Sequence, residues 1–403
     1  MLQILFVDDE QKILDGLKRT LRPLRHEWNC EFANGGAEGL KLLDRGTFDV
    51  VVTDVRMPTM DGMELLKQVK ARYPNLLRIV LSGQSELENL IKSSGVSHQY
   101  LTKPCALEEL KSAIERAFSL KRLLSDPFLI ELASKIDMIP SVSPVYLELE
   151  RLLKSSPACM DEVGSVIAKD MGMCAKVLQV ANSGCFSRIQ LISNPADAAG
   201  LLGFTTLQNL LYTDRVFQEF KPPRAKAFNI DGLWRHSLKC SMFAQEIAST
   251  FSEADDEVRS QAGVAGLLHD VGKLVMGCNL PEQYGSVMAL SAKEGLSDVE
   301  AERRVFQTSH AELGAYVMTL WNIPHPIVEA IAYHHAPAAS TNAESPVLTA
   351  VYVAELLASQ DHYQRNDPAA LRTDLSYLET IGLADRLSEW QGRCSGVPEL
   401  LSI

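Results

Sequence analysis

Residues 48–62 read FDVVVTDVRMPTMDG, and this stretch decides the fold of the first part of the chain. A short run of apolar, mostly β-branched residues ends at Asp54, and Pro and Gly follow it closely. A run of this length bounded by turn-forming residues is typical of a strand that is buried on both faces. The carboxyl end of such a strand is where open α/β sheets place their ligand sites. The stretch therefore predicts a parallel sheet with a functional aspartate at its edge.

The sequence around this stretch repeats the same pattern. Strand-like runs are expected at residues 3–9, 30–34, 49–54, 77–83 and 99–103, and amphipathic helix patterns such as 10–24 and 35–46 separate them. Strands that alternate with helices at this spacing favour a doubly wound α/β fold with helices on both faces. We therefore expect a five-stranded parallel sheet in the first part of a multidomain chain.

Charged and hydroxyl side chains gather at the ends of these expected strands, namely Asp8, Asp9, Asp54, Ser82 and Lys103. Three converging carboxylates repel one another unless a cation lies between them, and Mg²⁺ prefers such oxygen ligands. A lysine and a serine suit a phosphoryl group, because they offset its charge and donate hydrogen bonds. A carboxylate can also act as the nucleophile towards phosphorus. The alternative is that each aspartate only caps a helix, which five such residues at the ends of the expected strands disfavour.

The first 120 residues resemble the receiver domain of bacterial two-component response regulators. The resemblance rests on the blocks FVDDE, VVTDVRMPTMDG, VLSG and YLTKP. It implies phosphorylation of Asp54 by a cognate sensor histidine kinase and an Mg²⁺ ion in the receiver. It implies that Asp8, Asp9, Asp54 and the backbone carbonyl of Arg56 hold the metal. It also implies that Ser82 and Lys103 contact the phosphoryl group and that Tyr100 is the switch aromatic. An ordinary half-buried strand tyrosine is an equal interpretation of Tyr100.

The rest of the chain has a different, helical pattern. A helix pattern over residues 105–124 is interrupted by SDPF, since the residue before a proline is driven out of the helical conformation. From residue 140 onwards apolar residues recur at three-and-four spacing through ten or more segments. We expect a receiver domain at 1–122, a linker helix or loop at 123–139, and an all-α domain at 140–403 with a C-terminal helical extension.

Histidines and carboxylates recur through this helical part. The candidate ligands of a second, transition-metal site are His236, His269, Asp270, His310, His334, His335 and Glu355. Imidazoles and carboxylates are the usual ligands of such metals, and the adjacent His-Asp pair can present both groups at a distorted helix position. Burial as a hydrogen-bonded core pair is the alternative for His269 and Asp270. Adjacent residues of a regular helix point about 100° apart, so His334 and His335 are not expected to face one site. Lys273 is expected to be a solvated lysine at a helix end.

These blocks resemble the HD superfamily of metal-dependent phosphohydrolases, and most closely its HD-related output branch, HDOD. The resemblance covers residues 128–355 through IAKDMGMCAKVLQVANSGCF, LWRHS, GLLHDVGKLVM, SHAELGAYVMTLWNIP and IAYHH. HDOD domains are regarded as signalling outputs without demonstrated hydrolase activity. The chain departs from the catalytic pattern in two places. Glu355 stands where the superfamily has its last metal-binding aspartate, and APAASTN after His335 lacks the GYP motif of the cyclic-dinucleotide phosphodiesterases.

Charge and composition exclude several function classes. Residues 1–125 hold 18 Lys and Arg against 17 Asp and Glu, whereas the remainder holds 21 against 34. So acidic a second part would repel a phosphate backbone, which disfavours DNA binding. No apolar run is long enough for a membrane span and the N-terminus does not resemble a signal peptide, so a cytoplasmic protein is expected. The eight cysteines contain no CxxC pair and are expected to be reduced.

Three functions follow from these patterns. The favoured one is a phosphorylation-controlled response regulator whose non-catalytic HDOD output acts through an unknown downstream protein. The alternative is a receiver-controlled, metal-dependent phosphohydrolase of the HD type, acting on a nucleotide or cyclic dinucleotide. A transcription factor is disfavoured by the acidic second part. Receivers often dimerise, so a homodimer is a further expectation by analogy.

Overall fold

The structure is a computed structural model of the whole chain. It describes residues 1–82, 96–103, 105–121, 124, 126–136, 139, 143–154, 159–182, 191–212, 228–251, 255–363 and 375–397. The chain divides into two compact units, the first built mainly from residues 1–137 and the second from most of the remainder. We describe each unit by itself.

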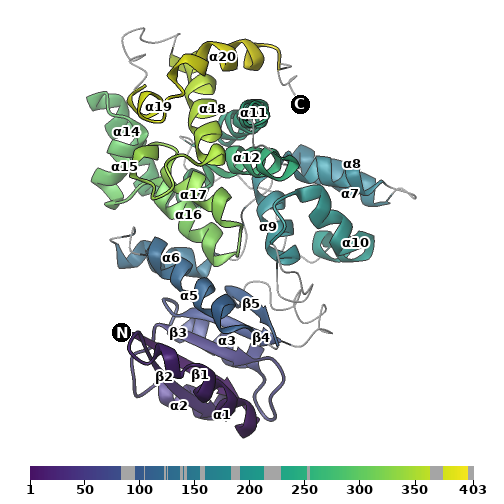
Figure 1. The fold of residues 1–403 in the computed structure, drawn as a ribbon, viewed down its shortest axis with the longest axis vertical. Helices are drawn as coiled ribbons and strands as arrows, with labels where there is room; N and C mark the ends of the chain where they lie inside the picture. The colour runs from purple at the N-terminus through teal and green to yellow at the C-terminus, as the bar shows by residue number, and fades with distance from the viewer. Residues whose placement is uncertain are drawn as a thin grey trace. The chain divides into compact units, whose positions relative to one another are not determined.

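The first unit contains a five-stranded parallel sheet, as the strand pattern predicts (Figure 1). Its strands are β1 (Leu2–Asp8), β2 (Trp28–Asn34), β3 (Val50–Asp54), β4 (Leu77–Ser82) and β5 (Gln99–Thr102). They lie in the order β2-β1-β3-β4-β5, with β1 paired in parallel to both β2 and β3. Because β1, β3 and β5 all end at the same edge of the sheet, the residues after them are brought together there.

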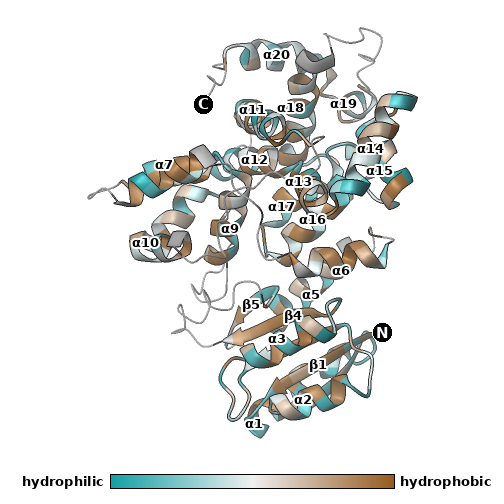
Figure 2. Ribbon diagram, turned by 180° about the vertical axis from the view of Figure 1, so that it is seen from behind, coloured by the Kyte–Doolittle hydropathy of each residue, from teal (hydrophilic) through white to brown (hydrophobic). Residues whose placement is uncertain are grey.

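Helices cover the sheet and bury its apolar strands (Figure 2). They are α1 (Gln11–Thr20), the short 3-10 helix η1 (Arg22–Leu24), α2 (Gly36–Leu43), α3 (Gly62–Arg72) and α5 (Leu107–Lys121), and α6 (Pro127–Lys135) follows α5. Leu5, Val51 and Val80 of the sheet pack in one core with Leu40 of α2 and Leu65 of α3. Strand side chains alternate between the two faces, and the intervening Ile4, Val52 and Ile79 are buried as well, so burial on both faces accounts for the near-continuous apolar character of the strands.

Helix α6 is attached to the sheet through Arg78 of β4, whose side chain is fully buried. The Arg78 guanidinium donates hydrogen bonds to the carbonyl oxygens of Val96, at 2.7 Å, and of Ser134 in α6, at 2.8 Å. It also lies 2.8 Å from Nε2 of His98. A buried guanidinium needs such acceptors for its five N–H groups. The contact therefore holds α6, in the expected linker, against the amino end of β4.

The second unit is all helical, which confirms the all-α prediction. Its described helices are α7 (Ser143–Lys154), α8 (Met160–Ile167), α9 (Met171–Ala181), α10 (Pro195–Tyr212), α11 (Ile230–Ala248), α12 (Asp256–Leu268), α13 (Val271–Asn279), α14 (Pro281–Glu294), α15 (Asp298–Phe306), α16 (His310–Leu320), α17 (His325–Tyr333), η3 (Pro337–Ala339), α18 (Pro346–Tyr363), α19 (Ser376–Thr380), η4 (Ala384–Arg386) and α20 (Leu387–Ser395).

Helices α11, α12 and α18 pack against one another at the centre of this unit. Two glycines permit close approaches there. A Cβ at Gly266 of α12 would crowd the backbone of Cys240 in α11, and a Cβ at Gly272 of α13 would overlap the carbonyl oxygen of His310 in α16. Such contacts are open only to glycine. They bring histidine-bearing segments that are distant in the sequence next to one another.

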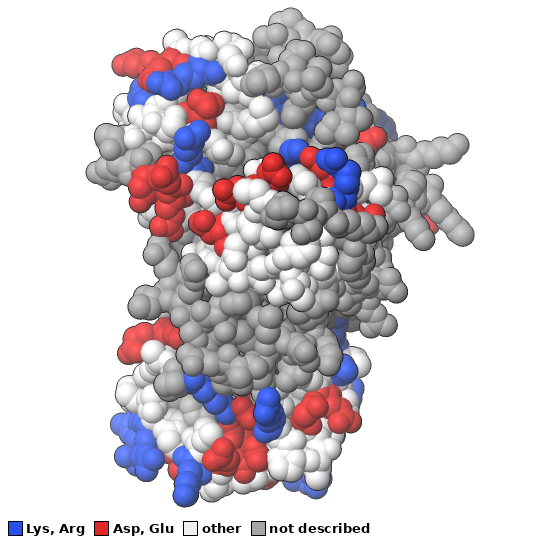
Figure 3. All heavy atoms as spheres, turned by 90° about the vertical axis from the view of Figure 1, so that its right-hand side faces the viewer, with Lys and Arg blue, Asp and Glu red and all other residues white. Residues whose placement is uncertain are grey.

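Two further features of the chain concern its charged side chains and the lengths of its helices. On the face drawn in Figure 3, Lys and Arg side chains are interspersed with Asp and Glu side chains, and the coloured residues form no extended basic surface. Among the described helices, none combines the length and the apolar character needed to cross a membrane.

Candidate functional site

The carboxyl edge of the sheet holds a compact cluster of two aspartates and one lysine. Nζ of Lys103, in the residues after β5, lies 2.7 Å from Oδ2 of Asp8 and 2.6 Å from Oδ1 of Asp54. Asp8 ends β1 and is buried, whereas Asp54 ends β3 and keeps 16% of its side chain exposed. The lysine thus bridges a buried carboxylate and a carboxylate that solvent can reach.

The loop after β3 orients Asp54. The backbone N–H of Arg56 donates to Oδ2 of Asp54 at 3.2 Å, and the N–H of Gly62 donates to the carbonyl of Val55 at 2.9 Å. A Cβ at Gly62 would overlap the carbonyl oxygen of Asp54, so only glycine fits at the start of α3. The Arg56 N–H thus holds Oδ2 of Asp54, while Oδ1 faces Lys103.

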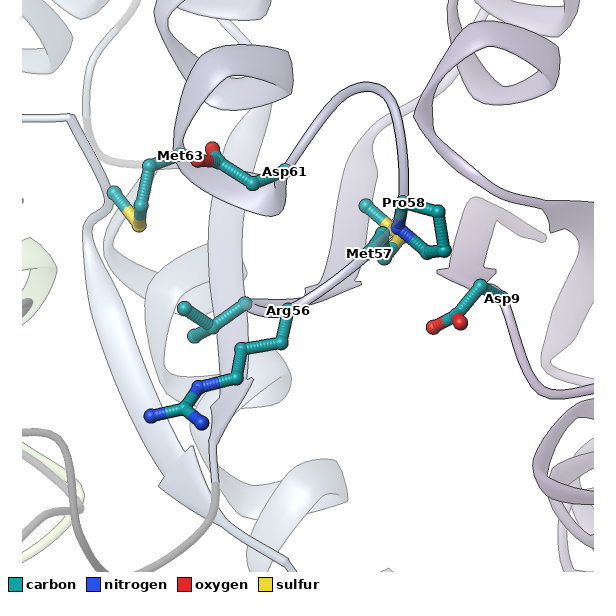
Figure 4. A pocket seen from close by; sticks show the side chains of 7 residues that line it. Asp9, Arg56, Met57, Pro58, Asp61 and Met63 are labelled. Carbon is teal, nitrogen blue, oxygen red and sulfur yellow. The ribbon is translucent and has the colours of Figure 1, made fainter.

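A pocket lies beside the cluster and is lined by Asp9, Val55, Arg56, Met57, Pro58, Asp61 and Met63. Figure 4 shows these side chains around the pocket, with Asp9 on a different segment from the others. Oδ1 of Asp61 accepts a hydrogen bond from the N–H of Glu64 at 2.7 Å, so Asp61 is the N-cap of α3. Asp9 has no such capping role among the described contacts. Its side chain lines the pocket from the segment that follows β1.

Burial and charge act against each other in this cluster. Burial raises the pKa of Asp54, and Lys103 only partly offsets that effect. Burial works to lower the pKa of Lys103, but its contacts with Asp54 and Asp8 outweigh burial and raise that pKa. One lysine therefore faces two carboxylates, which leaves a net negative site suited to a further cation.

Two of the predicted receiver residues cannot be placed in this geometry. Ser82 ends β4 and Tyr100 lies in β5, but their side chains fall outside the described part of the structure. Asp8, Asp54 and Lys103 are brought into contact, Asp9 lines the adjacent pocket, and the Arg56 backbone borders Asp54.

The second unit brings all seven of the predicted metal-ligand candidates together, in two adjacent groups of four donors each. Within each group the candidate ligand atoms lie within 4.8 Å of one another. The first group consists of His236, Cys240, His269 and Glu355, and the second of Asp270, His310, His334 and His335. The sequence predicts one site, so the division into two groups and the presence of Cys240 are new.

Different helices position the members of the first group. His236 and Cys240 are four residues apart on α11 and therefore lie on one face of that helix. His269 follows the last residue of α12, and Glu355 lies in α18. Oε2 of Glu355 lies 2.7 Å from Nε2 of His236 and 3.2 Å from Nε2 of His269. The extra methylene of glutamate thus lets this carboxylate reach both imidazoles.

The second group gathers at helix ends. Asp270 precedes α13 and His310 begins α16, while His334 and His335 follow α17. Nε2 of His310 lies 3.1 Å from Oδ1 of Asp270, 3.4 Å from Nε2 of His334 and 3.1 Å from Nε2 of His335. His335 is exposed, whereas the other three are buried. The second group is therefore open towards solvent on the side of His335.

Three of the imidazoles are held by hydrogen bonds at the nitrogen that faces away from the cluster. Nδ1 of His269 lies 2.7 Å from the carbonyl oxygen of Gly266, and Nδ1 of His334 lies 2.8 Å from that of Ile331. Nδ1 of His310 lies 2.7 Å from Oε2 of Glu302. Donation from Nδ1 leaves Nε2 directed at the cluster, which is how metal-binding histidines are oriented.

Two buried polar atoms in the cluster make no well-directed hydrogen bond, although each has a neighbouring side-chain atom within 3.2 Å. They are Nε2 of His269 and Oδ1 of Asp270. Orphaned buried polar atoms are rare and point to a missing ion or water. Burial would raise the pKa of Asp270, but Lys273 and the nearby histidines hold it well below its usual value. Burial, together with the neighbouring imidazoles, lowers the pKa of His334 well below its usual value. A charged carboxylate and a neutral imidazole are the ligand forms of these side chains.

Two predictions about this cluster are wrong. His334 and His335 do approach the same atom, because α17 ends at Tyr333 and the two residues leave the regular helix. Lys273 is not a solvated lysine: its side chain is 14% exposed and Nζ lies 3.0 Å from Oδ2 of Asp270. Burial would lower the pKa of Lys273, but Asp270 and Asp298 raise it well above its usual value.

Sequence reasoning also missed two residues that belong to this site. Cys240 could have been found from its four-residue spacing to His236 on a helix. Glu302 carries no local signal, because only the fold brings it to His310. Arg78 of the first unit was missed for the same reason, as it sits within an otherwise apolar strand pattern.

Comparison with known proteins finds two domain families in the chain. Residues 4–115 match the response regulator receiver domain family, and residues 139–337 match the HDOD domain family. The chain is a response regulator with an HDOD domain. Six of the seven predicted ligands lie in the matched HDOD range, and Glu355 lies beyond it.

Relatives of this response regulator match only parts of it. An uncharacterized protein of Treponema pallidum is 25% identical over 228 residues, which is 56% of this chain and 43% of that protein. The DNA-binding transcriptional regulator NtrC of Escherichia coli K12 is 34% identical over 155 residues, covering 37% of this chain and 33% of NtrC. The chain therefore spans less than half the length of these curated relatives.

A solved structure supports the fold. The MmoQ response regulator of Methylococcus capsulatus is 20% identical, with a TM-score of 0.51 over 63% of this chain and 98% of that one. At this identity the likeness concerns the fold alone. It agrees with a receiver-type sheet followed by a helical HDOD domain.

Proposed function

We propose that this response regulator is switched by phosphorylation of Asp54 and that its HDOD domain passes the signal on by binding another protein. The observation that carries the first part is the position of Lys103 Nζ, 2.7 Å from Asp8 and 2.6 Å from Asp54. An ammonium held there offsets the charge of a phosphoryl group that arrives at Asp54. A sensor histidine kinase in the cytoplasm is the expected phosphodonor.

The chemistry at Asp54 follows from its surroundings. Its carboxylate is the nucleophile, and the N–H of Arg56 holds Oδ2 at 3.2 Å. Asp8, Asp9 and Asp54, with the backbone carbonyl of Arg56, are the residues that would hold Mg²⁺. Bound there, Mg²⁺ supplies the positive charge that lets an anionic phosphodonor approach three carboxylates. The donor set fits, because it offers hard oxygen ligands and carries more negative charge than Lys103 neutralises.

The switch depends on contacts made only by the phosphorylated form. A phosphoryl group adds about −1.5 to −2 charge and can accept one to three charge-assisted hydrogen bonds. At about 1.5–3 kcal/mol each, two such bonds could supply most of the roughly 5.5 kcal/mol that inverts a 1:99 equilibrium. Lys103 and Ser82 are the proposed donors, with Tyr100 reporting the change.

The output domain is proposed to hold a transition metal through its two groups of ligands and to act on a protein partner. Orphaned donors at His269 and Asp270 support metal binding. The test is a pull-down from a lysate of the source cells, with the full chain in its Asp54-phosphorylated form and with Asp54→Asn. Partners are expected to differ between the two forms. Identical partner sets would contradict the signalling proposal.

A second candidate function is metal-dependent phosphoester hydrolysis. It is favoured by the completeness of the ligand set and by exposure of His335 at the second group. A metal with an open position there could activate water. The test is a panel of cyclic dinucleotides and nucleoside phosphates with Mn²⁺, Fe²⁺ or Mg²⁺. Turnover that disappears in His310→Ala, with the helical content unchanged, would make the protein an enzyme. No turnover is expected if the domain only binds partners.

A further inference from the structure

We infer that the thiolate of Cys240 is a metal ligand, so that the first group is a four-donor His₂GluCys centre for Zn²⁺ or a similarly thiophilic metal. The inference rests on the metal centre proposed above for the HDOD domain. It concerns a side chain of this chain that the recognised sequence blocks do not assign to any site.

The distances around Cys240 are those expected of ligands that share one metal. Sγ of Cys240 lies 3.5 Å from Nε2 of His236 and 3.5 Å from Oε2 of Glu355. Nε2 of His269 lies 3.2 Å from Oε2 of Glu355. Tetrahedral sites with bonds of about 2.0–2.3 Å have ligand atoms about 3.3–3.8 Å apart. These three distances match a tetrahedral arrangement within a few tenths of an ångström, whereas the 2.7 Å between Nε2 of His236 and Oε2 of Glu355 is a hydrogen-bond distance that lengthens when the two atoms share a metal.

An independent observation shows that the group is missing a partner. His269 is completely buried, and its Nε2 makes no well-directed hydrogen bond although Oε2 of Glu355 lies 3.2 Å away. Its Nδ1 is already engaged by the carbonyl of Gly266. A buried imidazole nitrogen without a partner is costly. A metal bound by all four donors satisfies this nitrogen and the Cys240 sulfur at once.

Charge balance favours a divalent metal with a thiolate. Two neutral imidazoles, one carboxylate and one thiolate carry two negative charges, which a dication neutralises in a largely buried place. Thiolate ligands favour Zn²⁺ and related metals over Mg²⁺ or Mn²⁺. Four protein ligands also leave no position for water, as in structural zinc sites. The first group then stabilises the packing of α11, α12 and α18, while its His236 and Glu355 keep 23% and 17% of their side chains exposed.

The experiment uses the full chain, stripped of metal with a chelator and kept reduced, with Co²⁺ alone as the probe. Cobalt bound to a thiolate gives a sulfur-to-metal charge-transfer absorption that imidazole and carboxylate ligands do not give. We expect this band in the wild type and in Cys278→Ala, a matched control in α13. We expect its loss in Cys240→Ala and Cys240→Ser. Zn²⁺ affinity should fall at least about tenfold in both Cys240 variants.

The outcomes separate this inference from the proposal on which it rests. Co²⁺ that binds without the band, or a band that persists in Cys240→Ala, overturns the thiolate ligand and leaves the metal centre in place. No Co²⁺ binding at all overturns both. If the Cys240 variants do not fold, X-ray absorption of the Zn²⁺-loaded wild type decides, since the inference requires a sulfur ligand at about 2.3 Å.

Discussion

Nδ1 of His310 lies 2.7 Å from Oε2 of Glu302, and both side chains are completely buried. The same carboxylate oxygen accepts the backbone N–H of His310 at 2.8 Å. Burial opposes protonation of the imidazole, but the charges of Glu302 and Asp270 outweigh it and raise the pKa of His310 to about 9. Glu302 therefore holds the ring in one orientation and increases its basicity, as the partners of metal-binding histidines do.

Substitution Glu302→Gln is expected to weaken metal binding at the second group. The amide keeps the size of the side chain but removes the charge that orients and polarises His310. We expect a loss of about 10–100-fold in metal affinity with little change in helical content. Calorimetric titration with Zn²⁺ measures it. Glu294→Gln, at an exposed position of α14, is the control and should leave the affinity unchanged. Equal affinities for both variants would contradict an orienting role for Glu302.

Asp54→Asn is expected to abolish phosphorylation, because the amide cannot act as the nucleophile. The full chain is incubated with a small phosphodonor and Mg²⁺, and incorporated phosphate is measured by intact mass. Asp61→Asn is a close control, since it changes a nearby carboxylate but keeps a side chain that can cap α3. Asp61→Asn should be labelled like the wild type. Phosphate incorporation into Asp54→Asn to the same extent would contradict Asp54 as the phosphorylated residue. Chelation of Mg²⁺ should prevent phosphate incorporation into the wild type and both variants.

The fold followed from local patterns in the sequence, because each strand of the sheet is a short apolar run between turn residues. VVVTD and QILFV need no distant information to be recognised as buried strands, and β3 and β1 lie where these runs predict. The order of the strands follows from the connections in such folds. The same holds for the helical part, where three-and-four spacing alone predicts most helices.

The site was harder to predict, because its details depend on where helices end and on how they meet. The sequence shows His334 and His335 as neighbours, but not that α17 stops one residue earlier. Cys240 and Glu355 are 115 residues apart and meet only through the packing of α11 on α18. Glu302 likewise reaches His310 only through the packing of the helices. Ligand types could be predicted from sequence, whereas their grouping could not.

Gly272→Ala is expected to disrupt the second group without touching any of its ligands. An added Cβ would overlap the carbonyl oxygen of His310, so α13 and α16 must separate. A displacement of this size moves Asp270 away from His310, and we expect metal affinity to fall at least about tenfold. The control is Gly285→Ala in α14, where a Cβ meets nothing within 4 Å. Gly285→Ala should be neutral or stabilising by up to about 1 kcal/mol. Unchanged metal binding in Gly272→Ala would show that this close approach does not position the ligands.

Arg78→Ala is expected to release α6 from the sheet. The change leaves the carbonyl of Val96 without its donor, at a cost of about 1–3 kcal/mol, and leaves the carbonyl of Ser134 only Nε2 of His98, at 3.3 Å. Hydrogen exchange in residues 127–135 should accelerate by roughly 10–100-fold, since each 1.4 kcal/mol is about a factor of ten. The control, Arg19→Ala, changes an exposed arginine of α1 and should leave hydrogen exchange in residues 127–135 unaltered. Equal exchange in α6 for both variants would mean that the helix is held by other contacts.

The stability of the metal-free protein should depend on pH in two opposite ways. His334 is buried, and its pKa lies well below the value of about 6.5 in an unfolded chain. As pH falls below about 6.5, the unfolded chain binds a proton there that the folded chain does not, so stability decreases. His310 has a folded pKa of about 9. Between about 6.5 and 9 the folded chain holds the extra proton, so this stabilisation is present below about 6.5 and is lost as pH rises.

We therefore expect the melting temperature of the chelator-treated protein to be highest near pH ~6.5 and to fall on both sides. His310 alone would contribute about 3 kcal/mol to the decrease at high pH, and His236, whose pKa Cys240 and Glu355 raise despite burial, acts in the same direction. His334→Gln should reduce the fall in melting temperature below pH ~6.5, and His310→Gln should reduce the fall above it. Differential scanning calorimetry from about pH 5 to about pH 9 measures both. A profile in which each variant keeps the wild-type slopes would show that these two imidazoles do not titrate with folding as their surroundings require.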